Sequence, residues 1–138
     1  MLKFRLIARL DIRNEWLIKT IRLEGTRKVG DPYEYAKEYD RCGVDEILYL
    51  DVVASLYGRN ALSDLVERTT ADVFCPVTAA GGIRSVEDGK HLFASGADCI
   101  GINTAAIERP ELITEIAEKY GSQAVTLQLD AKRKNGGS

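Results

Sequence analysis

The chain has 138 residues, of which 45% are hydrophobic and 29% charged, and its formal net charge is -2. This composition fits one globular domain with its own core, and the scattered acids and bases exclude nucleic acid as an expected partner. No apolar run reaches the length of a membrane span and no signal sequence precedes the first strand pattern, so we expect a cytoplasmic protein that makes no membrane contact.

The first predicted strand covers residues 4–11, which are mostly apolar and end in the acid Asp11. A long loop is expected to follow as far as Gly30. Lys19 lies within that loop and could swing over the end of the strand to hold an anionic group, although an exposed lysine is the simpler interpretation.

A helix start is predicted at Asp31. Asp31 can cap the helix, Pro32 suits its first turn and Glu34 its third position. The Cys42-Gly43 pair is expected to end the helix.

After this helix, strands and helices alternate. Strands are predicted at 46–51, 73–78, 99–102 and 124–130, with helices at 61–69, after Ser85, and from Pro110 to Tyr120. Strands that are apolar with little alternation, each followed by a helix, indicate a parallel sheet. The resulting (βα)4β pattern is that of half of a TIM (β/α)8 barrel, which typically needs ~250 residues. We therefore predict one α/β half-barrel domain over residues 1–138, with a flexible tail at 132–138.

Polar residues close the predicted strands. In a parallel barrel the carboxyl ends of the strands converge on one face, where active sites form. The residues at these ends are Asp11, Asp51, Gly81-Gly82, Asn103-Thr104 and Asp130.

Two of these strand ends suggest a phosphate site. Gly81-Gly82 lets the backbone approach an anion closely, and Asn103-Thr104 offers amide and hydroxyl donors beside it. A plain structural turn is the alternative interpretation of the glycine pair.

Asp11 and Asp130 are predicted to lie on opposite sides of one barrel mouth. Two facing carboxylates can divide general acid and general base work when their surroundings differ. The simpler alternative is that each carboxylate caps a loop or a helix start. At the opposite end of the barrel, Arg5 and Glu46 could form an ion pair across the floor.

The cysteines and the histidine do not predict a metal site or a cofactor. Cys42, Cys75 and Cys99 are widely spaced without a C-x-x-C motif, so we expect buried free thiols. His91 lies within a predicted helix without a Cys or His at ligand spacing, which favours a surface or packing role.

Taken as a set, these residues resemble the cyclase subunit of imidazole glycerol phosphate synthase. The resemblance extends over residues 1 to about 133. It is carried by Leu10-Asp11, Lys19, Gly30-Asp31-Pro32, Leu50-Asp51-Val52-Val53-Ala54-Ser55, Gly81-Gly82-Ile83, Gly96-Ala97-Asp98, Ile102-Asn103-Thr104-Ala105-Ala106, Gly121-Ser122-Gln123-Ala124-Val125 and Asp130-Ala131-Lys132-Arg133.

The resemblance implies a lyase of histidine biosynthesis. Members of that family take ammonia from a glutaminase partner and use it to cyclise and cleave a two-phosphate ribulosyl-formimino substrate. The products are imidazole glycerol phosphate and an aminoimidazole carboxamide ribonucleotide. The resemblance places the catalytic aspartates at Asp11 and Asp130, the loop lysine at Lys19, a phosphate site at Gly82, Asn103 and Thr104, and part of a charged gate at Arg5 and Glu46.

Three features depart from the family pattern. Cys99 stands where the family has a gate lysine. The glycine turn reads Thr78-Ala79-Ala80-Gly81-Gly82, one glycine short. Strands six to eight, which carry the second phosphate site, have no counterpart in this sequence.

Two segments, 17–25 and 55–60, resemble a paralogous branch associated with surface-polysaccharide amidation, which is also fed by a glutaminase. The Asp130-Ala131-Lys132-Arg133 segment instead resembles the histidine-pathway form. The sequence is therefore compatible with either branch.

The half-barrel pattern raises the question of what completes the barrel. Pairing with a second copy of the chain would cover the unpaired strand edges, with little or no activity expected from the isolated chain. A monomer with a flavodoxin-like five-stranded sheet is the alternative fold. A non-catalytic phosphate-binding fragment is the alternative function.

Overall fold

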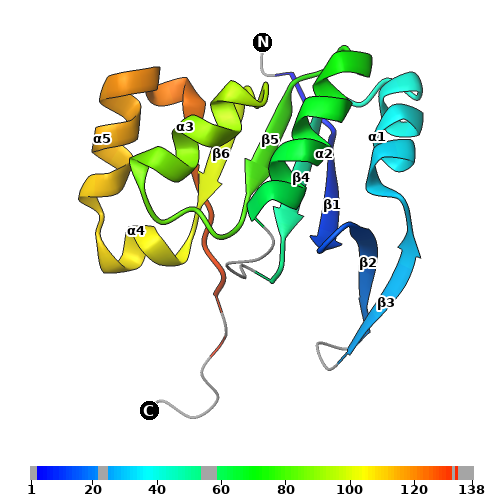
Figure 1. Ribbon diagram of the computed structural model, residues 1–138, viewed down its shortest axis with the longest axis horizontal. Helices are drawn as coiled ribbons and strands as arrows, with labels where there is room; N and C mark the ends of the chain where they lie inside the picture. The colour runs from blue at the N-terminus through cyan, green and yellow to red at the C-terminus, as the bar shows by residue number, and fades with distance from the viewer. Residues whose placement is uncertain (1–2, 22–24, 54–58, 132, 134–138) are drawn as a thin grey trace.

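The structure is a computed structural model that describes residues 3–21, 25–53, 59–131 and 133 (Figure 1). One seven-stranded sheet in the order β3-β2-β1-β4-β5-β6-β7 forms its centre. β1, β4, β5, β6 and β7 run parallel to one another, whereas β2 and β3 form an antiparallel hairpin beside β1.

The elements alternate along the chain. The strands are β1 (Ile7–Arg13), β2 (Trp16–Ile21), β3 (Gly25–Gly30), β4 (Glu46–Asp51), β5 (Val77–Ala80), β6 (Cys99–Ile102) and β7 (Val125–Leu127). The helices are α1 (Pro32–Arg41), α2 (Arg59–Asp72), α3 (Val86–Ala94), α4 (Thr104–Glu108) and α5 (Glu111–Tyr120), with the 3-10 turn η1 (Ser122–Ala124) before β7.

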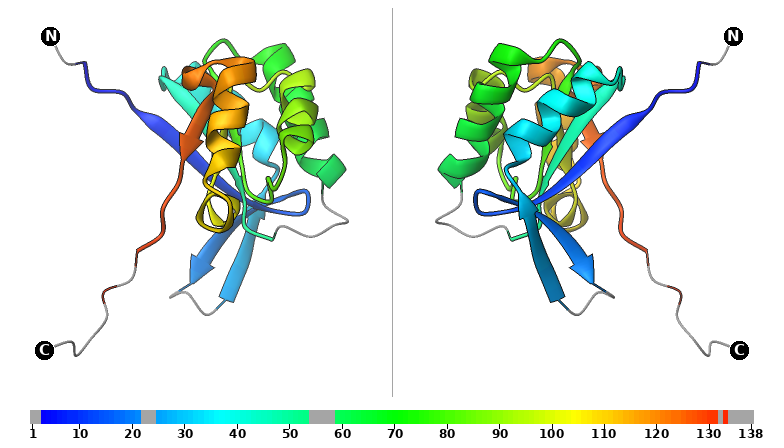
Figure 2. Two further views of the ribbon diagram at one scale, coloured as in Figure 1. Left: turned by 90° about the vertical axis from the view of Figure 1, so that its left-hand side faces the viewer. Right: turned by 90° about the vertical axis from the view of Figure 1, so that its right-hand side faces the viewer.

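The parallel strands follow one another in sequence order, and this order confirms the half-barrel. Each strand is joined to its neighbour by a crossover that contains a helix. Crossovers of the same hand and direction place the helices on one side of the sheet, as Figure 2 shows. A flavodoxin-like sheet would instead reverse its strand order at a switch point. That alternative is therefore wrong.

The core lies between the sheet and these helices. Ile47 and Tyr49 of β4 are fully buried beneath α1 and α2, and Ile100 of β6 is fully buried with Leu112 and Ile116 of α5. The Tyr49 hydroxyl lies 2.7 Å from the Thr69 hydroxyl. The largest polar side chain of this core is thus hydrogen-bonded.

The predicted helix signals are confirmed. The Asp31 carboxylate accepts a hydrogen bond from the Tyr33 amide at 2.9 Å, and Pro32 opens α1. Ser85 caps α3 through the Asp88 amide at 3.1 Å.

The first strand and the segment after it were predicted incorrectly. β1 begins at Ile7 and continues past Asp11 to Arg13. Asn14, with a φ of 56°, then turns the chain directly into the β2–β3 hairpin in place of the expected loop. Asn tolerates this left-handed conformation, which permits the tight turn. Lys19 consequently lies on a strand, paired with Arg27.

Other boundaries differ for local reasons. β5 starts later than expected because the Asp40 carboxylate binds the amides of Phe74 and Cys75, at 3.2 and 3.1 Å, before the strand begins. The short helix α4 was not predicted. β7 ends at Leu127, so Asp130 lies beyond the strand.

Among the described residues, no helix covers the face of the sheet that points away from α1, α2, α3 and α5 (Figure 2). This face carries alternate strand residues, because side chains alternate between the two faces of a strand. They include Ile7, Arg9 and Asp11 of β1 and Leu48 and Leu50 of β4. In a closed barrel this face would line the lumen, and we call it the lumen face.

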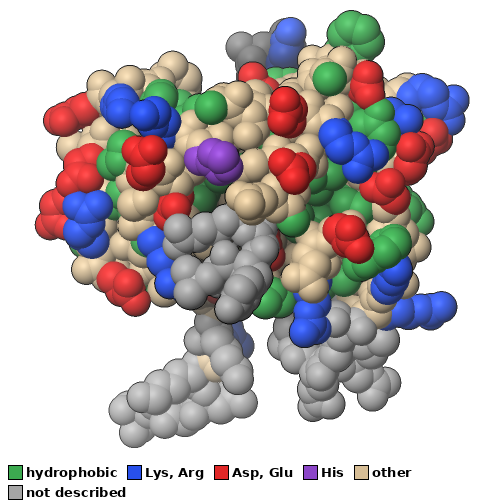
Figure 3. Space-filling view, in the orientation of Figure 1, with side chains coloured by type: hydrophobic (Ala, Val, Ile, Leu, Met, Phe, Trp, Pro, Cys, Tyr) green, Lys and Arg blue, Asp and Glu red, His purple; other side chains and the backbone are tan. Residues whose placement is uncertain are grey.

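The helix-covered side shows acidic and basic side chains interspersed (Figure 3), in agreement with the absence of a basic stripe from the sequence. Among the described residues, no helix is both long and apolar enough to cross a membrane. The three cysteines are free, as predicted. They are not buried, however, because Cys42 is exposed and Cys75 and Cys99 are half-buried.

Candidate functional site

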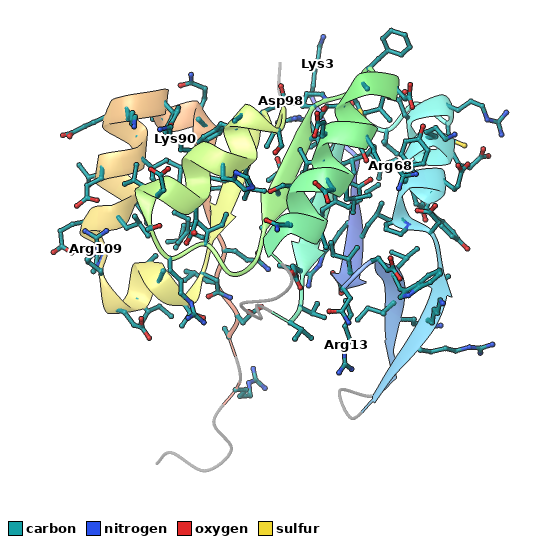
Figure 4. All side chains as sticks on the ribbon, viewed as in Figure 1. Lys3, Arg13, Arg68, Lys90, Asp98 and Arg109 are labelled. Atoms are coloured by element: carbon teal, nitrogen blue, oxygen red, sulfur yellow. The ribbon has the colours of Figure 1, made fainter. Side chains whose placement is uncertain are left out.

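One pocket of about 610 Å³ lies at the carboxyl ends of the parallel strands. Figure 4 marks this end of the molecule by Arg13 and the opposite end by Lys3 and Asp98. Ligand pockets typically have volumes of roughly 300–1,000 Å³. The lining includes Arg9, Asp11, Leu50, Asp51, Gly81, Gly82, Arg84, Gly101, Asn103, Thr104, Glu108, Gln128 and Asp130. The structure therefore brings together seven residues that the sequence predicted for this site.

Asp11 is held by a neighbouring arginine. Arg9 lies two positions earlier on β1, so both side chains project from the lumen face. The Arg9 Nε donates to Asp11 Oδ1 at 2.8 Å. The two side chains are 51% and 26% exposed, respectively. Asp11 thus enters the pocket as a carboxylate that a cation already orients.

Asp51, at the end of β4, is half-buried and lines the same pocket. Burial raises its pKa above the usual value for an aspartate, and a hydrogen bond from the Val53 amide at 3.0 Å acts in the opposite direction. Burial disfavours the charged form of a carboxyl group. Asp51 therefore accepts a proton more readily than a fully solvated aspartate would.

The Gly81-Gly82 turn follows β5 and brings backbone close to the pocket. Gly81 has a φ of 101° and Gly82 a φ of 69°, conformations that residues with a Cβ rarely adopt. A Cβ at Gly81 would also overlap the carbonyl oxygen of Asp51. The turn thus depends on glycine both for its dihedral angles and for its contact with β4.

Asn103, directly after β6, contacts Asp130. The Asn103 side-chain amide donates to Asp130 Oδ2 at 2.7 Å. Asn103 precedes α4, whose first residue is Thr104. The two predicted aspartates therefore have different partners in the same pocket: Asp11 contacts a cation, and Asp130 contacts a neutral amide.

The pocket carries more acidic than basic side chains. The acids are Asp11, Asp51, Glu108 and Asp130, and the bases are Arg9 and Arg84. An anionic ligand is therefore expected to bind where backbone amides and the two arginines offset the carboxylates.

A second polar cluster lies on the lumen face near the amino-terminal ends of the strands. Arg5 donates to Glu46 at 2.9 Å, as predicted, and the Thr78 hydroxyl donates to the same carboxylate at 2.5 Å. Cys99 lies 3.2 Å from the Thr126 hydroxyl. We call these five residues the floor cluster.

Lys19 was predicted for the site but is not among the described residues that line the pocket. It lies on β2 of the hairpin. The segments 17–25 and 55–60, which suggested a paralogous branch, fall partly outside the described residues.

Sequence reasoning missed Arg9 and Arg84 as pocket residues. The signal for Arg9 was its spacing of two from Asp11 on a strand, which places both side chains on one face. Arg84 follows the glycine turn by two positions, and that proximity was the available signal.

A family model described as histidine biosynthesis protein matches residues 5–137. The chain is 55% identical over 133 residues to the imidazole glycerol phosphate synthase subunit HisF of Legionella pneumophila, covering 96% of this chain and 63% of that protein. The subunits of the same name from Mycobacteroides abscessus and Corynebacterium glutamicum are 48% and 46% identical, over 96% and 94% of this chain and 52% and 50% of their own lengths. The chain thus spans between half and two thirds of the length of these curated relatives. The expected resemblance is confirmed.

Proposed function

Since the chain belongs to the histidine biosynthesis protein family, we propose that it supplies the catalytic aspartates and one phosphate site of an ammonia-dependent cyclase. In this proposal the substrate is a two-phosphate ribulosyl-formimino compound. The products are imidazole glycerol phosphate and an aminoimidazole carboxamide ribonucleotide. The observation that carries the proposal is the gathering of Asp11, Asp130 and the glycine turn around one pocket.

Asp11 and Asp130 would move the protons of the reaction. Ammonia must lose protons as it forms new bonds to carbon, and the departing group must gain one. A carboxylate within hydrogen-bonding reach can accept the first proton, and a second carboxyl group can return one. The different partners of the two groups, a cation at Asp11 and an amide at Asp130, suit such a division of work.

One phosphate of the substrate would bind at Gly82, Asn103 and Thr104, which we call the cradle. Gly82 offers its backbone amide, and the other two residues offer side-chain donors. The Asn103 amide currently donates to Asp130. A phosphate that takes this amide would free the Asp130 carboxylate, so binding and catalysis would be coupled at Asn103.

Titration of the chain with inorganic phosphate tests the cradle. We expect amide chemical-shift changes to centre on Gly82, Asn103 and Thr104 at millimolar phosphate. Asn103→Ala is expected to weaken binding about tenfold, because it removes a donor to a charged group. Shift changes centred on Arg133 and its neighbours would contradict the cradle.

The floor cluster supports a role in the passage of ammonia. In this proposal, ammonia from a partner would enter the lumen beside Arg5, Glu46 and Cys99, which lie near the amino-terminal ends of the strands. At the same end of the molecule the side chains of Phe4 and Phe74 are fully exposed. Exposed aromatic side chains are typical of interaction surfaces. We assign this surface to a glutaminase subunit that releases ammonia.

We also propose that the half-barrel domain pairs with a second copy in the absence of another chain. One edge of β1 pairs with β4 along Ile7 to Ile12. On the opposite edge, β2 pairs only with Ile12 and Arg13, so Ile7 to Asp11 have no strand partner on that side among the described residues. The far edge of β7 is likewise unpaired within the described part of the sheet. Such edges bind other strands readily.

Light scattering of the purified chain is expected to give a mass near twice 15.3 kDa. Four parallel strands from each copy suffice for an eight-stranded barrel, so β7 of one copy competes with β1 of the other. Ile7→Pro should shift the mass towards the monomer, because proline removes an edge donor. A monomeric mass for the unaltered chain at high concentration would exclude the pairing.

A further inference from the structure

Gln128 lines the pocket with a side-chain amide that the described part of the chain leaves unpaired. Its backbone is held in place, because the Gln128 N–H donates to the Ile102 carbonyl at 2.9 Å and extends the pairing of β7 with β6 by one residue. Its side chain is half-buried, yet no hydrogen bond joins it to any residue among 3–21, 25–53, 59–131 and 133. A group that can both donate and accept is therefore available to a ligand.

The Gln128 side chain projects from the lumen face. Residues two apart on an extended chain share a face. Thr126, two positions earlier, belongs to the floor cluster, and Asp130, two positions later, contacts Asn103 of the cradle. The Gln128 Oε1 lies 3.9 Å from the point that a Cβ of Gly101 would occupy. The amide thus lies over the Gly101 backbone, between the floor cluster and the cradle.

Gly101 keeps the space beside this amide open. It lines the pocket with backbone alone, and a Cβ added there would approach the Ala80 Cβ to 2.8 Å. A residue with a side chain at this position would therefore require the two strands to shift. Glycine within a strand is typical of places where another group approaches the backbone closely. A planar group can lie against this stretch of backbone, at the level of the Gln128 amide.

The surroundings of the Gln128 amide favour a neutral group. Asp130 lies two positions away on the same face, and the pocket carries more acids than bases, so an anion beside Gln128 would be repelled. A cation would bind at the carboxylates instead. A glutamine amide offers an acceptor and two donors, and a second primary carboxamide can satisfy one acceptor and one donor along a single edge.

We propose that Gln128 recognises a primary carboxamide of the ligand, and makes the pocket specific for a sugar phosphate that carries this group on a planar ring. The inference rests on the proposed function, in which one phosphate occupies the cradle and a carboxamide ribonucleotide is formed. Gln128 pairs with the end of β6, and paired strands are about 4.8 Å apart, so one ligand can contact both Gln128 and the cradle. Gln128 positions the ligand and moves no proton.

Calorimetric titration of the full chain with two nucleotides tests this role. Aminoimidazole carboxamide ribonucleotide carries the carboxamide and aminoimidazole ribonucleotide lacks it, whereas both have one phosphate. We expect the first to bind about tenfold more tightly, because a matched amide pair adds two hydrogen bonds. Gln128→Met should abolish this advantage and leave the affinity for the second nucleotide within twofold. Gln128→Glu, which keeps the length of the side chain but removes its donors, should also lack the advantage.

Gln123→Met is the matched control. Gln123 lies on η1, before β7, and is exposed, so the same chemical change should leave both affinities unaltered. Equal binding of the two nucleotides, or an advantage that persists in Gln128→Met, overturns the role of Gln128 and leaves the cradle intact. Gln128→Met that weakens both nucleotides by the same factor also overturns it, because the side chain then supports the pocket as a whole. Failure of both nucleotides to bind overturns the cradle and the inference together.

A second measurement does not depend on the affinities of the variants. The side-chain NH2 signals of Gln128 can be followed by NMR in the unaltered chain and assigned from their loss in Gln128→Met or Gln128→Glu. The carboxamide nucleotide should move these signals downfield, as expected for hydrogen-bonded N–H groups, and the nucleotide without the carboxamide should not. Signals that respond equally to both nucleotides, or to neither, overturn the proposal.

Discussion

Gly81→Ala is expected to destabilise the protein by about 3–5 kcal/mol, a large part of the usual stability of a domain. Two costs combine at this position. A φ of 101° is unfavourable for alanine, and the new Cβ would overlap the Asp51 carbonyl oxygen. Because that oxygen belongs to a paired strand, β4 and β5 would have to separate. Urea denaturation followed by circular dichroism measures the change.

Gly43→Ala is the control for this prediction. Gly43 has a similar φ of 89°, but a Cβ there would meet no atom within 4 Å. Its expected cost is the dihedral strain alone, about 1–2 kcal/mol. Equal losses in the two variants would mean that the contact with Asp51 contributes nothing, and would contradict the explanation of the turn given above.

Catalysis is expected to require both aspartates and a completed barrel mouth. We predict ammonium-dependent turnover when the chain is joined to the part of the Mycobacteroides abscessus subunit that it does not match. Asp11→Asn and Asp130→Asn should each lower kcat by about 10²–10⁴, the usual contribution of a general acid or base. The chain alone should be at least ~10² slower, because the mouth then lacks groups that position the substrate.

Asp64→Asn provides the matched control for these variants. Asp64 is an exposed acid on α2, remote from the lumen face, so the same chemical change should leave turnover unaltered. Adding a glutaminase subunit with glutamine should replace ammonium as the nitrogen source. Turnover that survives Asp11→Asn within threefold would refute the catalytic assignment.

The sequence predicted elements best where local signals and burial agree. β4 and β6 have their predicted boundaries, because each is a short apolar run that begins directly after a Gly-x-Asp turn. The hairpin was missed because β2 is held mainly by β3 and pairs with only two residues of β1. Such pairing leaves no buried alternating pattern in the sequence.

The site was predicted where it depends on strand ends and missed where it depends on side-chain reach. Parallel topology alone brings Asp11, Asp51 and Asn103 to one edge of the sheet. Lys19 was placed wrongly because its position depends on the hairpin. Arg9 was overlooked because its spacing of two from Asp11 indicates only that both side chains share a face, and not that the guanidinium extends along the strand to the carboxylate.

The sequential strand order also bears on how quickly the chain can fold. Each parallel strand pairs with the next parallel strand along the chain, so a contact needs the closure of only one strand-helix unit. Confining each closure to one unit limits its entropy cost, although parallel pairing is intrinsically slower than the local contacts of a helix. The sheet can therefore grow from β1 towards β7 one strand at a time.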